Sequence, residues 1–96
     1  MKVTVEYIGH IRNLVQNTRQ ETLELPDRSG IAQLLTTLSE KHGEPFKKAV
    51  YEKGSTDVKA NFIVTVNGYL LNQLQGLDTK LKDGDTVILM SVVSGG

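Results

Sequence analysis

Cysteine is absent from the 96 residues of this chain, and so is tryptophan. Without a thiol, the chain forms no disulfide, has no thiolate nucleophile and builds no cysteine-ligated zinc site. Its two histidines, His10 and His42, lie far apart and have no metal-ligand spacing around them. We therefore predict no metal site and interpret both histidines as ordinary surface or cap residues.

Long apolar runs and an excess of charge are absent as well. No stretch approaches the roughly 20 apolar residues of a membrane span, and the N-terminus lacks a basic segment followed by a long apolar one. Eleven basic residues balance eleven acidic ones, so no net charge draws the chain to nucleic acid or an anionic membrane. We expect a cytoplasmic protein that binds neither nucleic acid nor membrane.

The usual catalytic motifs are also missing: no phosphate loop, no dinucleotide fingerprint and no zinc-protease helix. Asp83 and Asp85 flank Gly84, a pattern that favours a turn over an acid–base pair. Lysines at 47, 48, 53 and 59 are offset by nearby acidic residues, which favours a solvated face over a docking patch for an acidic partner. The chain is therefore not predicted to be an enzyme on its own.

What the sequence does contain is regular hydrophobic periodicity. Residues 2–8 alternate between apolar and polar as far as Ile8, and residues 21–25 alternate until Pro26. Period-two alternation predicts half-buried strands, and two strands so close in sequence predict an antiparallel hairpin. The positions predicted to face inward are Val3, Val5, Tyr7, Leu23 and Leu25.

The period then changes to that of a helix over residues 30–42. Its apolar stripe is Ile31, Leu34, Leu35 and Leu38. Ser29 or Gly30 is the expected N-cap, and Gly43 the expected left-handed C-terminal cap. A second, shorter helix is predicted from Glu44-Pro45, with Phe46, Ala49 and Val50 on its buried side.

Two further strands are predicted at residues 62–66 and 86–93, with a turn at Asn67-Gly68 after the first of them. The last strand is apolar on both faces, which places it inside the sheet. If it lies beside the first strand, the fold is an α+β β-grasp with four to five strands in a mixed sheet. A ferredoxin-like fold is the alternative. We expect one β-grasp domain over residues 1–93 and a flexible tail over residues 94–96.

The chain ends in Val93-Ser94-Gly95-Gly96. Two glycines in the last two positions occur by chance in about 0.5% of proteins. Without a Cβ, such a tail enters a channel too narrow for side chains and presents the α-carboxylate of Gly96 as its reactive group. Adenylation by ATP would activate this carboxylate toward sulfide or toward an amine. The alternative is a glycine tail with no role.

Several segments together resemble one known family. They are Val3-Thr4-Val5-Glu6-Tyr7 with Ile11-Arg12, Leu23-Glu24-Leu25-Pro26, Val66-Asn67-Gly68, Leu81-Lys82-Asp83-Gly84-Asp85-Thr86-Val87 and Ser94-Gly95-Gly96. In this order they are similar to the small, MoaD-like subunit of molybdopterin synthase, within the MoaD/ThiS ubiquitin-like sulfur carriers. One departure is Ser91-Val92, where that family usually has a Pro-Pro pair.

The resemblance implies a cycle that begins at Gly96. A ubiquitin-activating-enzyme-like adenylyltransferase would use ATP to form the acyl-adenylate, and a sulfurtransferase would convert it to a thiocarboxylate. The molybdopterin synthase large subunit would then take the sulfur, with its own catalytic residues. Gly95 and Ser94 would give clearance for the tail, and no cofactor would be bound permanently.

Other outcomes stay open at this stage. The chain could be a protein modifier that forms isopeptide bonds through Gly96, an interaction module with an inert tail, or a sulfur carrier for thiamin, cysteine or tungsten-cofactor synthesis. The partners also need a surface on the domain. On the last strand, Ile88, Met90 and Val92 share one side, and we predict these for the interface, with core packing as the alternative. Arg12 is the polar candidate.

Overall fold

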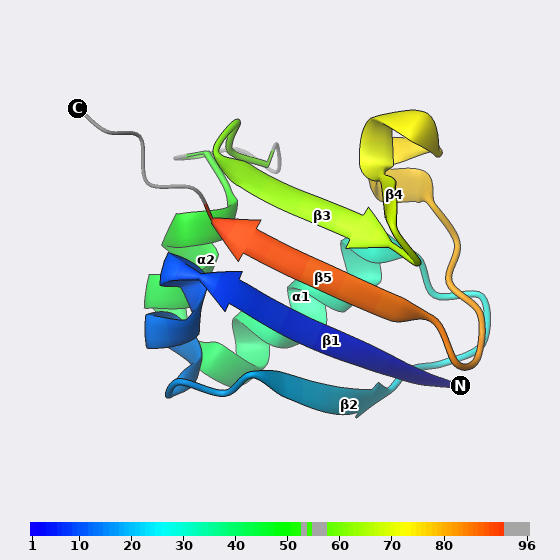
Figure 1. Cartoon of the computed structure of the whole chain (residues 1–96), viewed down its shortest axis with the longest axis horizontal. Coiled ribbons are helices and arrows are strands. Elements are labelled where there is room, and N and C mark those ends of the chain that lie inside the picture. Colours follow the sequence, from blue (N-terminus) through cyan, green and yellow to red (C-terminus); the bar gives the residue numbers. More distant parts are fainter. Residues whose placement is uncertain (53, 55–57, 92–96) are drawn as a thin grey trace.

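One mixed sheet of five strands forms the framework of the protein, in the order β2-β1-β5-β3-β4 (Figure 1). The computed structural model describes residues 1–52, 54 and 58–91. The predicted boundary between domain and tail, at residues 93 and 94, lies outside these residues.

The predicted hairpin is confirmed. β1 (Lys2–Gly9) pairs antiparallel with β2 (Gln20–Glu24), and Val3 lies opposite Leu23. Between them a 3-10 helix, η1 (His10–Val15), buries Ile11 and Val15. The inward positions predicted from the alternation are all buried, because successive side chains of a strand point to opposite faces.

α1 (Ile31–His42) matches the predicted helix to within one residue and lies across one face of the sheet (Figure 1). Its whole apolar stripe is buried. Gly30 is the N-cap, and its N–H donates to Oε1 of Gln33 at 2.8 Å. α2 (Glu44–Val50) comes directly after it and buries Phe46 and Val50.

Gly43, between the two helices, departs from the predicted left-handed cap. Its φ of 89° is positive as expected, but its ψ of −170° is extended. The reason is that the chain starts a new helix at once. The N–H of Gly43 donates to the carbonyl of Ser39, and the carbonyl of Gly43 accepts from the N–H of Lys47. One residue thus ends α1 and caps α2.

The second half of the chain supplies β3 (Phe62–Val66), β4 (Tyr69–Leu70) and β5 (Thr86–Ser91). Asn67 and Gly68 form the predicted turn between β3 and β4, both with positive φ. Two short 3-10 helices that the sequence did not predict, η2 (Leu71–Gln73) and η3 (Gly76–Asp78), lie between β4 and β5.

β5 is the central strand, parallel to β1 and antiparallel to β3. Its Val87 and Leu89 are fully buried under the helices. A hairpin, a crossing helix and a last strand placed beside the first constitute the β-grasp fold. The ferredoxin-like alternative is wrong, because the described residues supply one long α-helix, α1, and then the seven-residue α2. None of the described helices is long and apolar enough to cross a membrane.

Candidate functional site at the end of the central strand

The end of β5 is held on both sides. Ser91, its last residue, pairs with Gly9 of β1 and with Phe62 of β3. The strand therefore ends at a fixed point in the middle of the sheet. Four residues predicted for the site lie outside the described part of the chain; they are Val92, Ser94, Gly95 and Gly96.

Gly9 allows the strands to approach closely at this point. Its φ of 79° and ψ of −148° lie in a region that is essentially limited to glycine. A Cβ built on Gly9 would lie 3.1 Å from the carbonyl oxygen of Ser91. Both the backbone angle and the space thus require glycine here.

Arg12 belongs to the same end of the sheet, because η1 packs against both β1 and β5. Its side chain is half-buried, and its Nε is buried without a hydrogen-bond partner. The hydroxyl of Ser91 also lacks a partner. A buried polar group without a partner costs about 1–3 kcal/mol.

The face of the sheet away from α1 carries the apolar residues predicted for an interface. Ile88 and Met90 alternate with the buried Val87 and Leu89, and they stay half-buried on the open face. Neither Ile88 nor Met90 is among the buried residues of the core, and their place in an interface stays a prediction.

The register adds residues that the sequence reasoning missed. Ile8 of β1 and Ile63 of β3 both lie opposite Met90, on either side of it. Ile8 is 42% exposed. One signal was present in the sequence: the alternation of residues 2–8 breaks at Ile8, where a polar residue is expected. Several apolar side chains side by side on an open face are typical of a surface that contacts another molecule. We call Ile8, Ile63, Ile88 and Met90 the open-face patch.

On the opposite side of the sheet, Glu21 organises a polar cluster. The hydroxyl of Tyr7 donates to Oε2 of Glu21 at 2.6 Å, and Nε2 of His42 lies 2.9 Å from the same oxygen. Lys41 donates to Oε1. The His42 ring packs against Phe46 and edge-on to Tyr7. His42, only 13% exposed, is therefore not the surface residue that the sequence suggested.

The cluster changes the acidity of its members. Burial acts to raise the pKa of Glu21, but hydrogen bonds from Lys41, Tyr7 and His42 together with the charge of Lys41 bring that pKa below its ordinary value. Burial, the hydrogen bond to Glu21 and the negative charge of Glu21 raise the pKa of Tyr7. Glu21 is thus ionised and Tyr7 neutral at physiological pH.

No metal-binding constellation appears in the part of the chain that the structure describes. No group of three His, Cys, Asp or Glu residues is placed to hold a metal ion within it. Asp83 and Asp85 are turn residues, as predicted: Asp83 accepts from the Lys2 N–H, and Asp85 accepts from Asn67 and from the Lys82 N–H.

Comparison with known proteins decides the family. The model of the ThiS family matches residues 5–96, from β1 to the terminal Gly-Gly. This chain belongs to the ThiS family. Proteins of the MoaD/ThiS type are ubiquitin-like sulfur carriers and small modifiers, which typically carry a C-terminal thiocarboxylate and are not catalytic themselves.

Solved structures agree with this assignment. A Pyrococcus furiosus protein described as molybdopterin converting factor, subunit 1, is 31% identical to this ThiS-family chain, with a TM-score of 0.76 over 97% of this chain and 99% of the other. The small archaeal modifier protein 1 of Methanosarcina acetivorans is 26% identical, with a TM-score of 0.83 over 99% and 96%.

A third structure shares the fold. It is the BexX/CysO complex of Amycolatopsis orientalis, in which the matched chain is 21% identical, with a TM-score of 0.75 over 98% of this chain and 99% of the other. No curated protein shows a significant match to this sequence.

Proposed function

We propose that this ThiS-family protein carries sulfur as a thiocarboxylate on Gly96 and donates it in molybdopterin synthesis, as the small subunit of a molybdopterin-synthase-like complex. In this proposal residues 1–93 form the domain that the partners hold. Residues 94–96 form the tail that enters their active sites, and Gly95 and Ser94 give it clearance.

The chemistry belongs to the backbone carboxylate. An adenylyltransferase joins the Gly96 carboxylate to the α-phosphate of ATP and releases pyrophosphate. A sulfurtransferase supplies sulfide, the C–S bond forms, and AMP leaves. The carboxylate oxygen has then been replaced by sulfur, and no side chain of this protein needs to act as nucleophile, acid or base.

The observation that carries the proposal is the family match that runs through Gly95 and Gly96. A second observation supports it: the central strand β5, which precedes the tail, is paired on both sides as far as Ser91. Such anchoring suits a tail that must enter a partner at a reproducible position. The molybdopterin pathway is favoured by the similarity to the Pyrococcus furiosus protein.

The proposal requires three partners: a ubiquitin-activating-enzyme-like adenylyltransferase, a sulfurtransferase and a molybdopterin synthase large subunit. The open-face patch is the surface that we assign to them, with Arg12, at the end of the sheet where η1 packs against β1 and β5, as the polar candidate. The BexX/CysO complex, in which a protein of this fold is bound to another protein, supports the requirement for a protein partner.

A second candidate function is protein modification. The similarity to the small archaeal modifier protein of Methanosarcina acetivorans favours it. Here the Gly96 acyl group is transferred to a lysine amine, forming an isopeptide bond in place of the thiocarboxylate.

Because the chain contains no cysteine, no thiol side chain can react with an alkylating reagent and obscure the test. The protein is incubated with its activating enzyme, ATP and a sulfur donor, and its intact mass is measured before and after treatment with a thiol-alkylating reagent. We expect an ATP-dependent gain of about 16 Da, because oxygen is exchanged for sulfur, and alkylation at Gly96 alone. A methionine oxidation of the same nominal mass would not be alkylated.

The matched control is the chain that lacks Gly96, which we expect to stay folded and unlabelled. Larger lysine-linked adducts in place of alkylation would identify the modifier. Alkylation of the shortened chain at the level of the full chain would contradict the proposal.

A further inference from the structure

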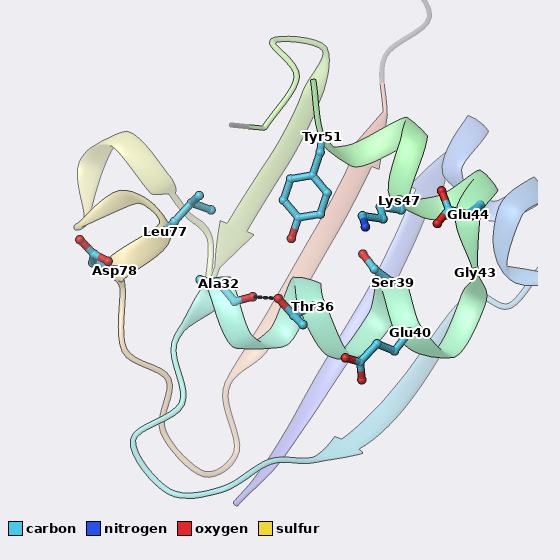
Figure 2. Close-up of a pocket in the computed structure, with 10 residues that line it drawn as sticks. All are labelled: Ala32, Thr36, Ser39, Glu40, Gly43, Glu44, Lys47, Tyr51, Leu77 and Asp78. Carbon is cyan, nitrogen blue, oxygen red and sulfur yellow. Dashed lines mark hydrogen bonds between the residues drawn. The ribbon is translucent and has the colours of Figure 1, made fainter. Parts of the chain in front are cut away.

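A groove runs along the outer side of α1, within the helix layer and away from the open-face patch. It has a volume of about 710 Å³. Its floor is a stripe of small residues at helical spacing, namely Ala32, Thr36, Ser39 and Gly43. Figure 2 shows Tyr51 reaching toward this stripe from the end of α2 and Leu77 approaching it from η3.

Both walls are fixed by the backbone. Tyr51 donates its N–H to the carbonyl of Lys47 and forms a β-bridge with Val58. On the other side, the N–H of Ile31 donates to the carbonyl of Thr79, which ties the end of η3 to the start of α1. The groove is therefore preformed, which lowers the entropy that a bound molecule must lose.

The hydroxyl groups of the floor already have hydrogen-bond partners within the protein. The hydroxyls of Thr36 and Ser39 donate to the carbonyls of Ala32 and Leu35, at 3.0 Å and 2.8 Å. Burial raises the pKa of Tyr51, which keeps its phenol neutral. Hydrogen bonding to Thr36 and Ser39 acts in the opposite direction on the Tyr51 pKa, so the phenol lies close to both hydroxyls. The floor thus presents methyl, methylene and ring surface, with its hydroxyls engaged by the helix and by Tyr51.

The charges along the groove are unbalanced, although the whole chain is neutral. Glu40, Glu44 and Asp78 contribute three carboxylates, against the single ammonium of Lys47. Within the described ranges, 1–52, 54 and 58–91, none of these four side chains forms an ion pair. The groove thus has an excess of negative charge.

The dimensions favour a segment of polypeptide over a small molecule. The stripe from Ala32 to Gly43 extends over about 16 Å at 1.5 Å per residue. The distance at which another helix packs against α1 depends on the side chains between them, and those of the stripe beside Tyr51 are small. An amphipathic helix laid in an apolar groove is a common mode of recognition.

We infer that this groove binds a cationic amphipathic helix of a partner protein, with its apolar side on the α1 stripe and lysines or arginines facing Glu40 and Glu44. The inference goes beyond the proposed function, because it does not use Gly96. The groove and the open-face patch lie on opposite sides of the sheet, so one partner could hold the protein here while another works on its tail.

The test uses an amidated leucine–lysine peptide of about four helical turns with leucines on one side. The same design with glutamate in place of lysine is the control peptide. Binding is mapped on the full-length protein by amide chemical shifts. We expect the cationic peptide alone to shift residues of α1, α2 and η3, with an affinity that falls as salt rises.

Two substitutions are expected to act in opposite directions. Glu40→Lys should weaken binding about 10-fold, since it replaces an attraction by a repulsion. Residue 40 lies in the last turn of α1, where a positive charge interacts favourably with the helix dipole, so we expect the variant to fold. Lys47→Gln should tighten binding about 2-fold. Glu24→Lys, on β2 and away from the groove, is the matched control and should leave the affinity unchanged.

Three outcomes would overturn the inference: peptide-induced shifts outside the groove, equal binding of both peptides, or self-association of the protein through this face. The chain without Gly96 should bind the peptide normally. Failure of the groove and failure of the carrier function are therefore distinguishable.

Discussion

Glu21 is the central residue of the polar cluster that it forms with Tyr7, Lys41 and His42. Its carboxylate accepts from Tyr7 and Lys41 and lies beside Nε2 of His42, so that β1, β2 and the end of α1 meet at one side chain. Its side chain is 12% exposed. Hydrogen bonds that are shielded from water to this extent contribute more to stability than exposed ones.

Replacing Glu21 with Gln should destabilise the fold by about 1–3 kcal/mol. The amide removes the charge that Lys41 contacts and weakens the hydrogen bond from Tyr7. Urea denaturation measures the loss. Glu24→Gln, an exposed position on the same strand, should change stability by less than about 0.5 kcal/mol. Equal effects of the two substitutions would contradict this account of Glu21.

The lowered pKa of Glu21 also predicts a pH dependence. A carboxyl whose pKa is lower in the folded state stabilises the fold above its unfolded value of 4.5, and this contribution is lost as pH falls through the folded pKa. The stability difference between wild type and Glu21→Gln should therefore shrink below about pH 4.5. Denaturation curves across this range measure it, and a difference that grows on acidification would be inconsistent with the cluster.

At the scale of elements, the hairpin and the central strand meet at Gly9, and the ends of the two helices meet at Gly43. Both glycines have a positive φ with an extended ψ, at 79° and −148° for Gly9 and at 89° and −170° for Gly43. They differ in surroundings. A Cβ at Gly9 would lie 3.1 Å from the Ser91 carbonyl oxygen, whereas one at Gly43 would meet only Cδ of Pro45, at 3.9 Å.

Substituting Gly9 and Gly43 in turn separates the energetic cost of backbone strain from the cost of steric crowding. Gly43→Ala should cost about 1–3 kcal/mol, from the backbone angle alone. Gly9→Ala should cost about 1 kcal/mol more, because the new methyl group displaces the end of β5. Urea denaturation gives the costs, and amide shifts at Ser91 report the displacement. An equal cost, with Ser91 unmoved, would show that the end of β5 is not closely held.

At the scale of the whole molecule, the sheet divides two surfaces. Helices cover one side, and the open-face patch remains on the other. The helix layer buries one row of β5 and leaves its alternate row without an internal partner. The surface assigned to the partners is therefore a direct consequence of the β-grasp topology.

Met90→Lys should leave the fold intact, because the lysine stem lies along the patch while its ammonium reaches water. Binding to the activating enzyme should weaken at least about 10-fold, since the charge must be desolvated in the complex. Titration calorimetry measures the affinity. Thr22→Lys, on the same face but on the edge strand β2, should bind normally. Normal binding by Met90→Lys would show that the open-face patch is not part of the interface.

Most of the fold could be predicted from the sequence, because it depends on local periodicity. The alternation in β1 and β2, the stripe of α1 and the turns at Asn67-Gly68 and Asp83-Gly84-Asp85 are written in neighbouring residues, and the structure confirms each of them. The short helices η2 and η3 were not predicted, since they bury none of their residues and so have no apolar pattern to reveal them.

What only the tertiary structure decided are the groupings of residues distant in sequence. Register places Ile8 and Ile63 beside Met90, and strand order brings Arg12 to the end of β5. Glu21 meets His42 only once the hairpin and helix have packed. Periodicity tells which way a side chain points along its own element. Which other elements it meets depends on how the apolar faces pack together, and that is a property of the whole chain.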